Sequence, residues 1–350
     1  MKRKLTLFQK SWLYFFVHFS LEVACFYFLY SRVYPTLFWG LFALLYDSVA
    51  FALQGVFGIW LDKHPSVPLG GIGCVFVALA LFTPVRILAV LFIGVGNAFV
   101  HIDGAQHTLR DSNSKLTPNA LFVGGGSFGV ITGQLLGVLG IKPLIFLPLF
   151  LILSCVFVCI VITKNTFPDK QSIESSALPL FDKDNKKLPD GVFVFLVVFT
   201  VAVRSYIGYA IPISWNKSIW QAILLFSAMG IGKILGGISA DLLGFRKTAY
   251  ISLGFALPFL LFGDSLMLLS LLGVTLFSMT MPLSVGLLCS RFPTTPAFAF
   301  GLTTLGLFFG IAPAFFIVLP SLLAHQITVL FLSVSALICF IITTKKEKGA

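Results

Sequence analysis

Residues 58–63 read GIWLDK, and residues 237–247 read GISADLLGFRK. Each stretch follows a long apolar segment, and each has a glycine four residues before an aspartate and basic residues after it. The two aspartates, Asp62 and Asp241, are 179 residues apart in a chain of 350. A pattern that returns after half the chain indicates two related halves. Many secondary transporters are built from such halves, with a substrate site where the halves meet.

A second pattern, made of glycines, repeats at the same offset: Gly126 and Gly306 are 180 residues apart. Glycine lets neighbouring helices approach closely, because it has no Cβ. The repeat therefore predicts one tightly packed helix in each half. The glycines concerned are Gly124, Gly125, Gly126, Gly129, Gly133 and Gly137 in the first half and Gly301, Gly306 and Gly310 in the second.

The composition is that of a membrane protein. Hydrophobic residues make up 58% of the chain, charged residues make up 11%, and the mean hydropathy is +1.00. A soluble domain has about 25% charged residues, so this chain cannot cover its surface for water. Its apolar runs are about 20 residues long, which is the length that an α-helix needs to cross a bilayer. We therefore expect an all-α polytopic membrane protein surrounded by lipid.

Twelve apolar spans divide into two groups of six. The predicted domains are a six-helix bundle over 1–163, a polar cytoplasmic linker over 164–190, and a second six-helix bundle over 191–350. The short loops predict that consecutive helices are antiparallel neighbours, and we expect a monomer. The spans are 11–31, 37–61, 67–84, 86–108, 117–140, 143–163, 191–212, 217–240, 247–263, 265–287, 296–318 and 323–343.

The net charge of +11 follows the topology. With the N-terminus inside, 18 of the 24 Lys and Arg residues fall on the cytoplasmic side of these spans. This bias is the positive-inside rule and predicts that both termini are cytoplasmic. The charge therefore gives no reason to expect a nucleic-acid partner.

No cleavable signal peptide is evident, and the compact loops predict a plasma membrane, in particular a bacterial inner membrane.

The two repeated loop patterns predict a conformational latch. Their glycines allow close helix approach, and each acid at a helix end can pair with a neighbouring base. Such a pair stabilises one conformation of a moving bundle and breaks in another. The simpler alternative is that the bases only anchor the topology. The latch residues are Gly58, Asp62 and Lys63 in the first copy and Gly237, Asp241, Gly244, Arg246 and Lys247 in the second.

Ionisable residues at membrane depth are the strongest functional signal, because they are costly there and normally face an internal cavity. Glu22 lies near the centre of the first span, with His18 one turn earlier on the same face. Asp47 is central in the second span. We predict that Glu22 and Asp47 exchange protons. The predicted substrate or counter-ion contacts are His18, Gln54, Asn97, His101, Arg204 and Lys233.

A structural interpretation of these charges competes with the functional one. Buried charges need partners, so Glu22 or Asp47 could pair with Arg204, His101 or Lys233 and hold the helices in register.

No cofactor and no metal site are predicted, because His18, Glu22, His101 and Asp103 hardly form a metal-ligand pattern. The six cysteines lie in apolar spans, where a buried apolar role is expected.

The two loops, twelve spans and central linker resemble the major facilitator superfamily. The N-terminal half is similar to the fosmidomycin-resistance-type efflux transporters. The residues that carry this similarity are His18–Glu22 in the first span, 52–65 at the end of the second, 96–101 in the fourth and 121–129 in the fifth. The resemblance implies proton-driven export of drugs or metabolites. Drug antiporters usually have a proline after a glycine in the fifth helix, whereas Gln134 follows Gly133 here.

These observations predict a secondary transporter that works by alternating access and is not an enzyme. The first hypothesis is proton-coupled export of a small organic compound or drug. The second is a proton symporter that imports an organic anion or sugar, with Arg204, His101 and Lys233 as positive contacts. Two hypotheses of another class are a degenerate transporter that acts as a sensor or scaffold and an intramembrane enzyme.

Overall fold

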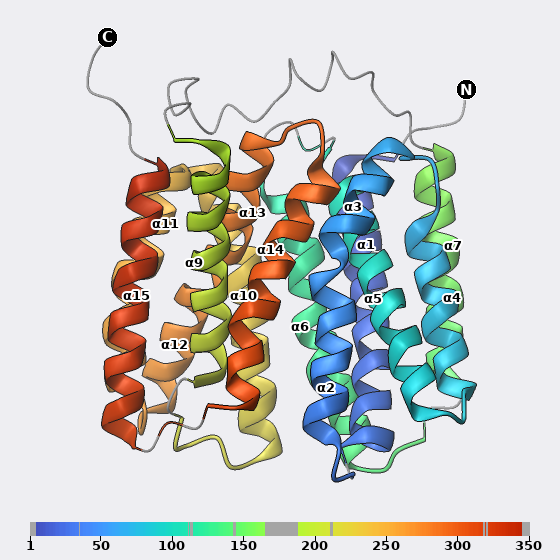
Figure 1. Ribbon diagram of the computed structural model, residues 1–350, viewed down its shortest axis with the longest axis horizontal. Coiled ribbons are helices and arrows are strands. Elements are labelled where there is room, and N and C mark those ends of the chain that lie inside the picture. Colours follow the sequence, from blue (N-terminus) through green and yellow to red (C-terminus); the bar gives the residue numbers. More distant parts are fainter. Residues whose placement is uncertain are drawn as a thin grey trace.

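The computed structural model describes residues 5–34, 36–110, 112, 115–142, 145–164, 188–210, 213–317, 319 and 321–344. Helices account for nearly all of these residues (Figure 1). The first half contains α1 (Leu7–Phe28), η1 (Leu29–Val33), α2 (Trp39–Asp47), η2 (Ser48–Ala52), α3 (Gln54–Lys63), α4 (Leu69–Phe82), α5 (Arg86–Leu109), α6 (Thr117–Val138) and α7 (Phe146–Lys164). The second half contains α9 (Asp190–Ala210), α10 (Ile219–Leu243), α11 (Phe245–Phe262), α12 (Met267–Ser278), α13 (Thr280–Arg291), α14 (Pro296–Ile311), η4 (Ala312–Phe315) and α15 (Leu322–Thr344).

Each of the twelve predicted spans corresponds to one helical rod. Ten rods are long and apolar enough to cross a membrane, and α4 and α11 are the other two. The predicted linker lies mostly outside the described residues, so the domain boundaries stay a prediction. The start of α1 and the end of α15 lie at the same end of the molecule (Figure 1), as an even number of spans requires. This end is the predicted cytoplasmic one.

Two of the rods are interrupted. The second span consists of α2, the π-helical turn η2 and α3, so one turn between Asp47 and Gln54 is wider than in an α-helix. Single π-turns of this kind shift which face a helix presents and often occur at functional sites. The tenth span is broken at Met279 between α12 and α13, near Pro282, which cannot donate a backbone hydrogen bond.

The predicted glycine repeat is a packing repeat. In the first half the glycine side of α6 lies against α1, and in the second half the glycine side of α14 lies against α9. A Cβ added to Gly133 would lie 2.9 Å from the backbone nitrogen of Tyr27, and one added to Gly306 would lie 2.8 Å from the carbonyl oxygen of Val198. Each half therefore has the same glycine-dependent crossing between its fifth and first helices.

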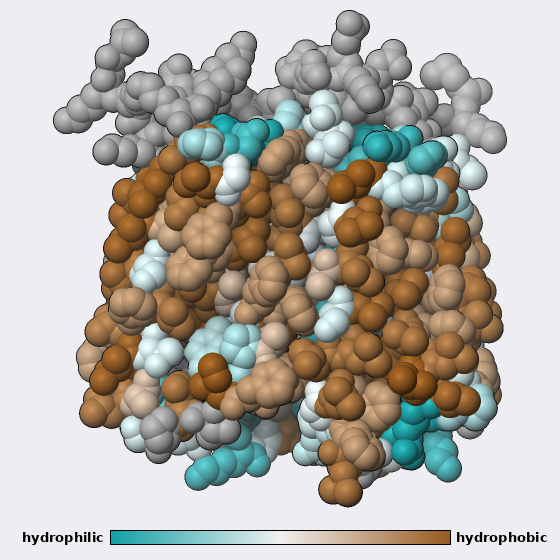
Figure 2. Space-filling view, viewed as in Figure 1, coloured by the Kyte–Doolittle hydropathy of each residue, from teal (hydrophilic) through white to brown (hydrophobic). Residues whose placement is uncertain are grey.

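The surface has the distribution of polarity that a bilayer requires. On the face in view, a broad band of hydrophobic residues covers the middle of the molecule, and hydrophilic residues gather at its two ends (Figure 2). Phe195, Phe331 and Ile152 are examples of large apolar side chains that are well exposed within the band. Exposed apolar surface on this scale is stable only in lipid. The protein is therefore a multi-pass membrane protein.

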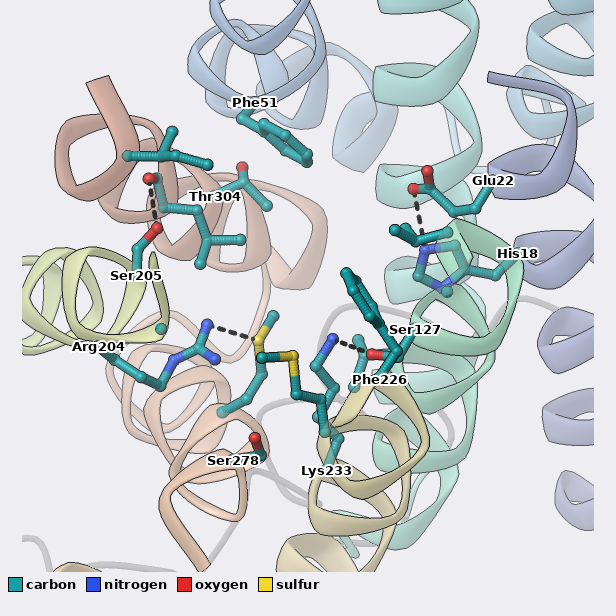
Figure 3. Close-up of a pocket in the computed structure, with 18 of the residues that line it drawn as sticks. His18, Glu22, Phe51, Ser127, Arg204, Ser205, Phe226, Lys233, Ser278 and Thr304 are labelled. Atoms are coloured by element: carbon teal, nitrogen blue, oxygen red, sulfur yellow. Dashed lines mark hydrogen bonds and ion pairs between the residues drawn. The ribbon is translucent and has the colours of Figure 1, made fainter. Parts of the chain in front are cut away.

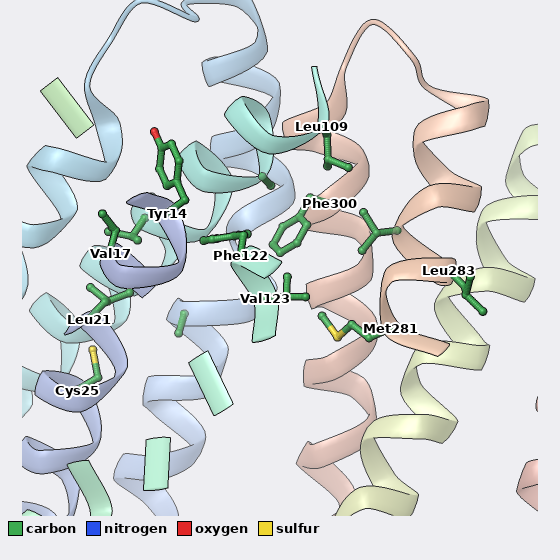
Figure 4. Close-up of a cluster of buried hydrophobic side chains, with 14 of the residues drawn as sticks. Tyr14, Val17, Leu21, Cys25, Leu109, Phe122, Val123, Met281, Leu283 and Phe300 are labelled. Atoms are coloured by element: carbon green, nitrogen blue, oxygen red, sulfur yellow. The ribbon is translucent and has the colours of Figure 1, made fainter. Parts of the chain in front are cut away.

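The halves share one hydrophobic core. Buried side chains from α1, α5 and α6 belong to the same cluster as side chains from α13 and α14. Phe122 and Phe300 face one another across the boundary between the halves (Figure 4), with ring centroids 6.2 Å apart. Apolar packing thus joins the halves near the level at which the cavity described below begins.

The α1–α6 crossing gives a stability prediction. Gly133→Ala places a methyl group against the backbone of Val23 and Tyr27, which cannot move aside. Overpacking of this kind costs about 1–3 kcal/mol, so the melting temperature of the purified protein in detergent should fall. The matched control is Gly254→Ala in α11, where no atom lies within 4 Å of the added Cβ. An equal melting temperature for the two variants would contradict the tight crossing.

Candidate functional site

A cavity of about 350 Å³ lies between the two halves (Figure 3). The first half lines it with residues of α1, η2, α5 and α6, and the second half lines it with residues of α9, α10, α12, α13 and α14. Most lining side chains are apolar, including Phe26, Phe51, Phe226 and Met229. The polar ones are His18, Glu22, His101 and Ser127 from the first half and Arg204, Ser205, Lys233, Ser278 and Thr304 from the second.

Among the described residues that line this cavity, Glu22 is the only acidic one, and three side chains contact it. Its Oε1 lies 3.4 Å from His18 Nε2 and 3.7 Å from His101 Nε2. Asn97 Nδ2 donates hydrogen bonds of 2.9 Å both to Glu22 Oε1 and to the Tyr46 hydroxyl. Glu22 Oε2 is buried and has no hydrogen-bond partner among the described residues. One carboxylate oxygen is therefore held in place, and the other has its hydrogen-bonding capacity unused.

Both histidines are oriented by backbone carbonyls. His18 Nδ1 lies 2.8 Å from the carbonyl oxygen of Phe122, and His101 Nδ1 lies 2.9 Å from that of Asn97. A carbonyl oxygen only accepts, so both Nδ1 atoms carry hydrogen. The two Nε2 atoms are left to face Glu22. Depending on whether a proton is bound, each of them can act as a lone-pair donor or as a cationic N–H.

Two cations face the same cavity from the second half. Arg204 Nη2 contacts Met281 Sδ at 2.9 Å, and Arg204 Nε is buried without a hydrogen-bond partner among the described residues. Lys233 Nζ donates a 2.8 Å hydrogen bond to Ser127 Oγ on α6, across the boundary between the halves. Within the part of the chain that the structure covers, neither cation forms an ion pair with a carboxylate.

The other predicted site residues take different places. Asp47 is buried at the end of α2, outside the residues that line the cavity. Gln54 is fully buried and donates to the carbonyl oxygen of Ala50 at 2.6 Å, so it too lies outside the lining. Asn97 reaches the site indirectly, through Glu22. Of the two predicted proton carriers, the structure thus places only Glu22 in the cavity, and the role of Asp47 stays a prediction.

The two repeated aspartates make equivalent contacts across the halves. Asp62 at the end of α3 accepts hydrogen bonds from the backbone N–H groups of Ala297 (3.2 Å) and Phe298 (2.9 Å), at the start of α14. Asp241 near the end of α10 accepts from the backbone N–H groups of Leu116 (2.8 Å) and Thr117 (2.9 Å), at the start of α6. Each aspartate therefore caps the N-terminus of a helix in the opposite half, where the helix dipole favours negative charge.

The repeated glycines make this capping possible. A Cβ on Gly58 would lie 2.6 Å from the backbone of Ala297, and a Cβ on Gly237 would lie 3.0 Å from the carbonyl oxygen of Leu116. Gly244 has a different purpose: its φ of +88° forms the turn between α10 and α11. Only glycine adopts such a φ without strain.

The sequence predicts that each acid can pair with a neighbouring base, and the structure shows which groups lie near the two aspartates. Among the described residues, Lys63, Arg246 and Lys247 have no ion pair with Asp62 or Asp241. The base near Asp62 is instead Arg110, whose Nη2 lies 3.8 Å from Oδ1. The physical reason is that a helix N-terminus offers several backbone N–H groups without partners, and these are closer to the aspartates than the flexible bases.

Several residues of the site were missed by the sequence analysis. Ser127 lies inside the glycine-rich stretch 121–129, so its position was marked but its role was not. Tyr46 lies within the second predicted span and Arg110 just after the fourth, and no local pattern distinguishes them. Their partners, Asn97 and Asp62, come from other helices. Only the packing of the helices identifies these contacts.

Comparison with known proteins supports the fold. No protein-family model matches the sequence, and no curated protein matches it. Among solved structures, the chain is similar to FucP, a major facilitator superfamily transporter in the outward conformation, with a TM-score of 0.63 and 13% identity over 96% of this chain and 99% of that one. It is also similar to the human organic anion transporter MFSD10 (TM-score 0.64, 15% identity, 97% of this chain and 100% of that one).

A third similar structure is a bacterial homologue of the iron transporter ferroportin in the outward-facing state, with a TM-score of 0.58 and 13% identity over 97% of this chain and 98% of that one. Identities this low establish the fold alone. The predicted fold class is therefore confirmed: the chain has the fold of major facilitator superfamily transporters, with two six-helix halves.

The capping contacts generate a prediction about local opening. Asp62→Ala should increase hydrogen–deuterium exchange at the N–H groups of Ala297 and Phe298, and Asp241→Ala should do so at Leu116 and Thr117. Loss of an N-terminal cap costs about 0.5–2 kcal/mol, which corresponds to about 2- to 30-fold faster exchange where local opening limits it.

The matched control is Asp264→Ala. Asp264 also accepts a backbone hydrogen bond, from Ser214 at 2.9 Å, but within the second half. This variant should leave exchange at the starts of α6 and α14 unchanged. If Asp264→Ala changed exchange there as much as Asp62→Ala did, the contacts across the halves would not be a latch.

Proposed function

We propose that the chain is a secondary transporter that carries a small organic anion across the membrane by alternating access and couples this movement to protons at Glu22. One observation supports the substrate class more than any other. Arg204 and Lys233 face a cavity between the halves, and in the described part of the chain no carboxylate forms an ion pair with either cation.

The energetic argument starts from the cost of burying charge. A charged side chain at membrane depth is stable only with a partner or with water. Arg204 has a thioether contact and Lys233 has a hydroxyl contact, and neither contact supplies opposite charge. An anion that enters the cavity supplies it. A carboxylate, phosphate or sulfonate fits these two bases, because guanidinium and ammonium groups donate charge-assisted hydrogen bonds to such oxygens.

The apolar part of the lining indicates what surrounds the anionic group. Phe26, Phe51, Phe226 and Met229 are among the apolar side chains that form the remaining wall. Small-molecule sites generally combine such apolar walls with a few placed polar groups. We therefore infer an organic anion with an apolar body, rather than a fully hydrated inorganic ion.

Glu22 with its two histidines is the proposed proton site. A proton bound by Glu22, His18 or His101 adds one positive charge to the first-half wall. The three groups can share this proton, because Glu22 Oε1 lies 3.4 Å from His18 Nε2 and 3.7 Å from His101 Nε2. Because His18 is also hydrogen-bonded to the backbone of α6, protonation changes the contacts of the helix that Asp241 caps. Proton binding and opening of the predicted cytoplasmic end are thus linked through α6.

Two of the similar structures are transporters whose names are consistent with this proposal. One is a fucose:proton symporter of E. coli, and another is the human organic anion transporter MFSD10. The similarity to fosmidomycin-resistance-type exporters and the export direction remain hypotheses. Export and import differ in the sign of the proton gradient that drives uphill transport, so both are tested in the same vesicles.

Removal of either cation should weaken binding of the anion. Arg204→Gln and Lys233→Gln should each lower affinity about 10- to 100-fold, since a hydrogen bond to a charged group contributes about 1.5–3 kcal/mol. The ligand is first found by a thermal-shift screen of carboxylates, organic phosphates and sulfonates in detergent. Arg291→Gln is the control, because Arg291 pairs with Asp190 outside the cavity. Equal affinity in all variants would overturn the anion assignment.

Neutralisation of the proton site should separate coupling from transport. In proteoliposomes, Glu22→Gln should abolish accumulation driven by a proton gradient, while exchange of labelled for unlabelled substrate continues. The reason is that exchange needs the alternating movement but no net proton transfer. Uphill accumulation at the wild-type rate in this variant would refute Glu22 as the coupling residue. The parallel variant Asp47→Asn tests the second predicted carrier.

A further inference from the structure

The arrangement of His18, Glu22 and His101 carries an inference that the proton mechanism does not require. One possible ligand atom from each residue lies within 4.8 Å of the others, and all three residues are buried. The 3.4 and 3.7 Å separations from Glu22 Oε1 to the two Nε2 atoms are longer than ordinary hydrogen bonds of about 2.7–3.2 Å. They are close to the edge of a coordination tetrahedron, about 3.3–3.6 Å when each ligand lies about 2.0–2.2 Å from the metal.

The surroundings of the cluster are those of a prepared metal site. Ligating histidines almost always donate their second ring N–H to a carbonyl or carboxylate, which fixes the ring and leaves the other nitrogen for the metal. Both histidines do this here, through Nδ1 to the carbonyl oxygens of Phe122 and Asn97. Asn97 also holds Glu22 Oε1 by a 2.9 Å hydrogen bond. The second carboxylate oxygen, Oε2, is buried and has no hydrogen-bond partner among the described residues.

We propose that His18 Nε2, His101 Nε2 and the Glu22 carboxylate bind a first-row divalent transition-metal ion, with its remaining coordination position open to the central cavity. Two imidazoles and one carboxylate suit Zn²⁺, Co²⁺, Fe²⁺ or Mn²⁺, whereas Mg²⁺ and Ca²⁺ prefer sites made of oxygen ligands. Three protein ligands with an open fourth position characterise sites that exchange ligands rather than purely structural ones. The site departs from the sequence-based prediction of no metal, because its third ligand comes from α5.

The charges that face this cluster set the conditions for binding. Glu22 contributes one negative charge, and Lys233 and Arg204 line the same cavity with positive charge. The ammonium of Lys233 therefore opposes a divalent cation, and an anion between the halves reduces this repulsion. The metal site does not depend on the proposed anion transport, since its ligands all belong to the first half and the anion contacts belong to the second.

The test uses the full chain, purified without a histidine tag in detergent, and Co²⁺ as the probe. We expect one Co²⁺ per chain by equilibrium dialysis and a visible absorption spectrum of four-coordinate Co²⁺ with nitrogen and oxygen ligands. His18→Ala, His101→Ala and Glu22→Gln should each weaken binding about tenfold or more. His325→Ala is the matched control, because its Nδ1 also contacts the carbonyl oxygen four residues earlier, at 2.8 Å, but it lies outside the cavity.

Lys233→Gln separates this inference from the proposed function. It should strengthen Co²⁺ binding, since it removes a repulsive charge, and weaken anion binding. Absence of Co²⁺ binding to the wild-type chain, or an affinity equal in wild type, His18→Ala and His101→Ala, would overturn the metal site. The wild-type spectrum decides the question even if a variant fails to fold. Anion affinity is measured without metal, so failure of one proposal leaves the other to its own test.

Discussion

The reciprocal capping of helix N-termini by Asp62 and Asp241 is the contact on which the arrangement of the halves depends. A glycine four residues before each aspartate lets its helix pack closely against the opposite half. The aspartate then accepts hydrogen bonds from backbone N–H groups that would otherwise lack partners. Because one contact runs from the first half to the second and the other runs back, the two together restrain both rotation and separation at this end. A single contact would leave a hinge.

The capped helices are also the helices that build the cavity. On α6, Phe122 accepts the hydrogen bond of His18, and Ser127 accepts that of Lys233. On α14, Phe300 lies against His101, and Thr304 lines the cavity wall. A change at either aspartate therefore moves the residues that hold the proposed proton and anion sites. Conversely, a charge placed on His18 or taken up by Lys233 acts on the helix whose start is capped. The proposed alternating access requires a mechanical connection of this kind between the ends of the helices and the cavity.

Most of the fold could be predicted from the sequence, because each apolar run is long enough to specify one membrane helix, and the glycine and aspartate repeats specify two similar halves. The pair of His18 and Glu22 followed from helical spacing alone. His101, Arg204 and Lys233 were predicted to be functional because of their depth in the membrane, but their position around one cavity depends on how α5, α9 and α10 pack. The partners of Asp62 and Asp241 could not be predicted, because they are backbone N–H groups and have no signature in side-chain identity. The wide turn between Asp47 and Gln54 determines which way these residues face. It could not be predicted either, because no local residue pattern indicates a π-turn.

The charges in the cavity are divided between its two walls, and this division is the reason that the two ligands proposed for it have opposite sign. The first half contributes a carboxylate and two histidines, which together favour a cation, either a proton or a metal ion. The second half contributes a guanidinium and an ammonium, which favour an anion. While the cavity is empty the two walls attract each other, but a cation bound alone is repelled by the second wall and an anion bound alone is repelled by the first. When both are bound, the two ligands attract each other. Binding of a cation and an anion is therefore cooperative on electrostatic grounds, without any change of conformation. The proposed coupling then needs only that the change of conformation be easier when the charges of the two walls are balanced.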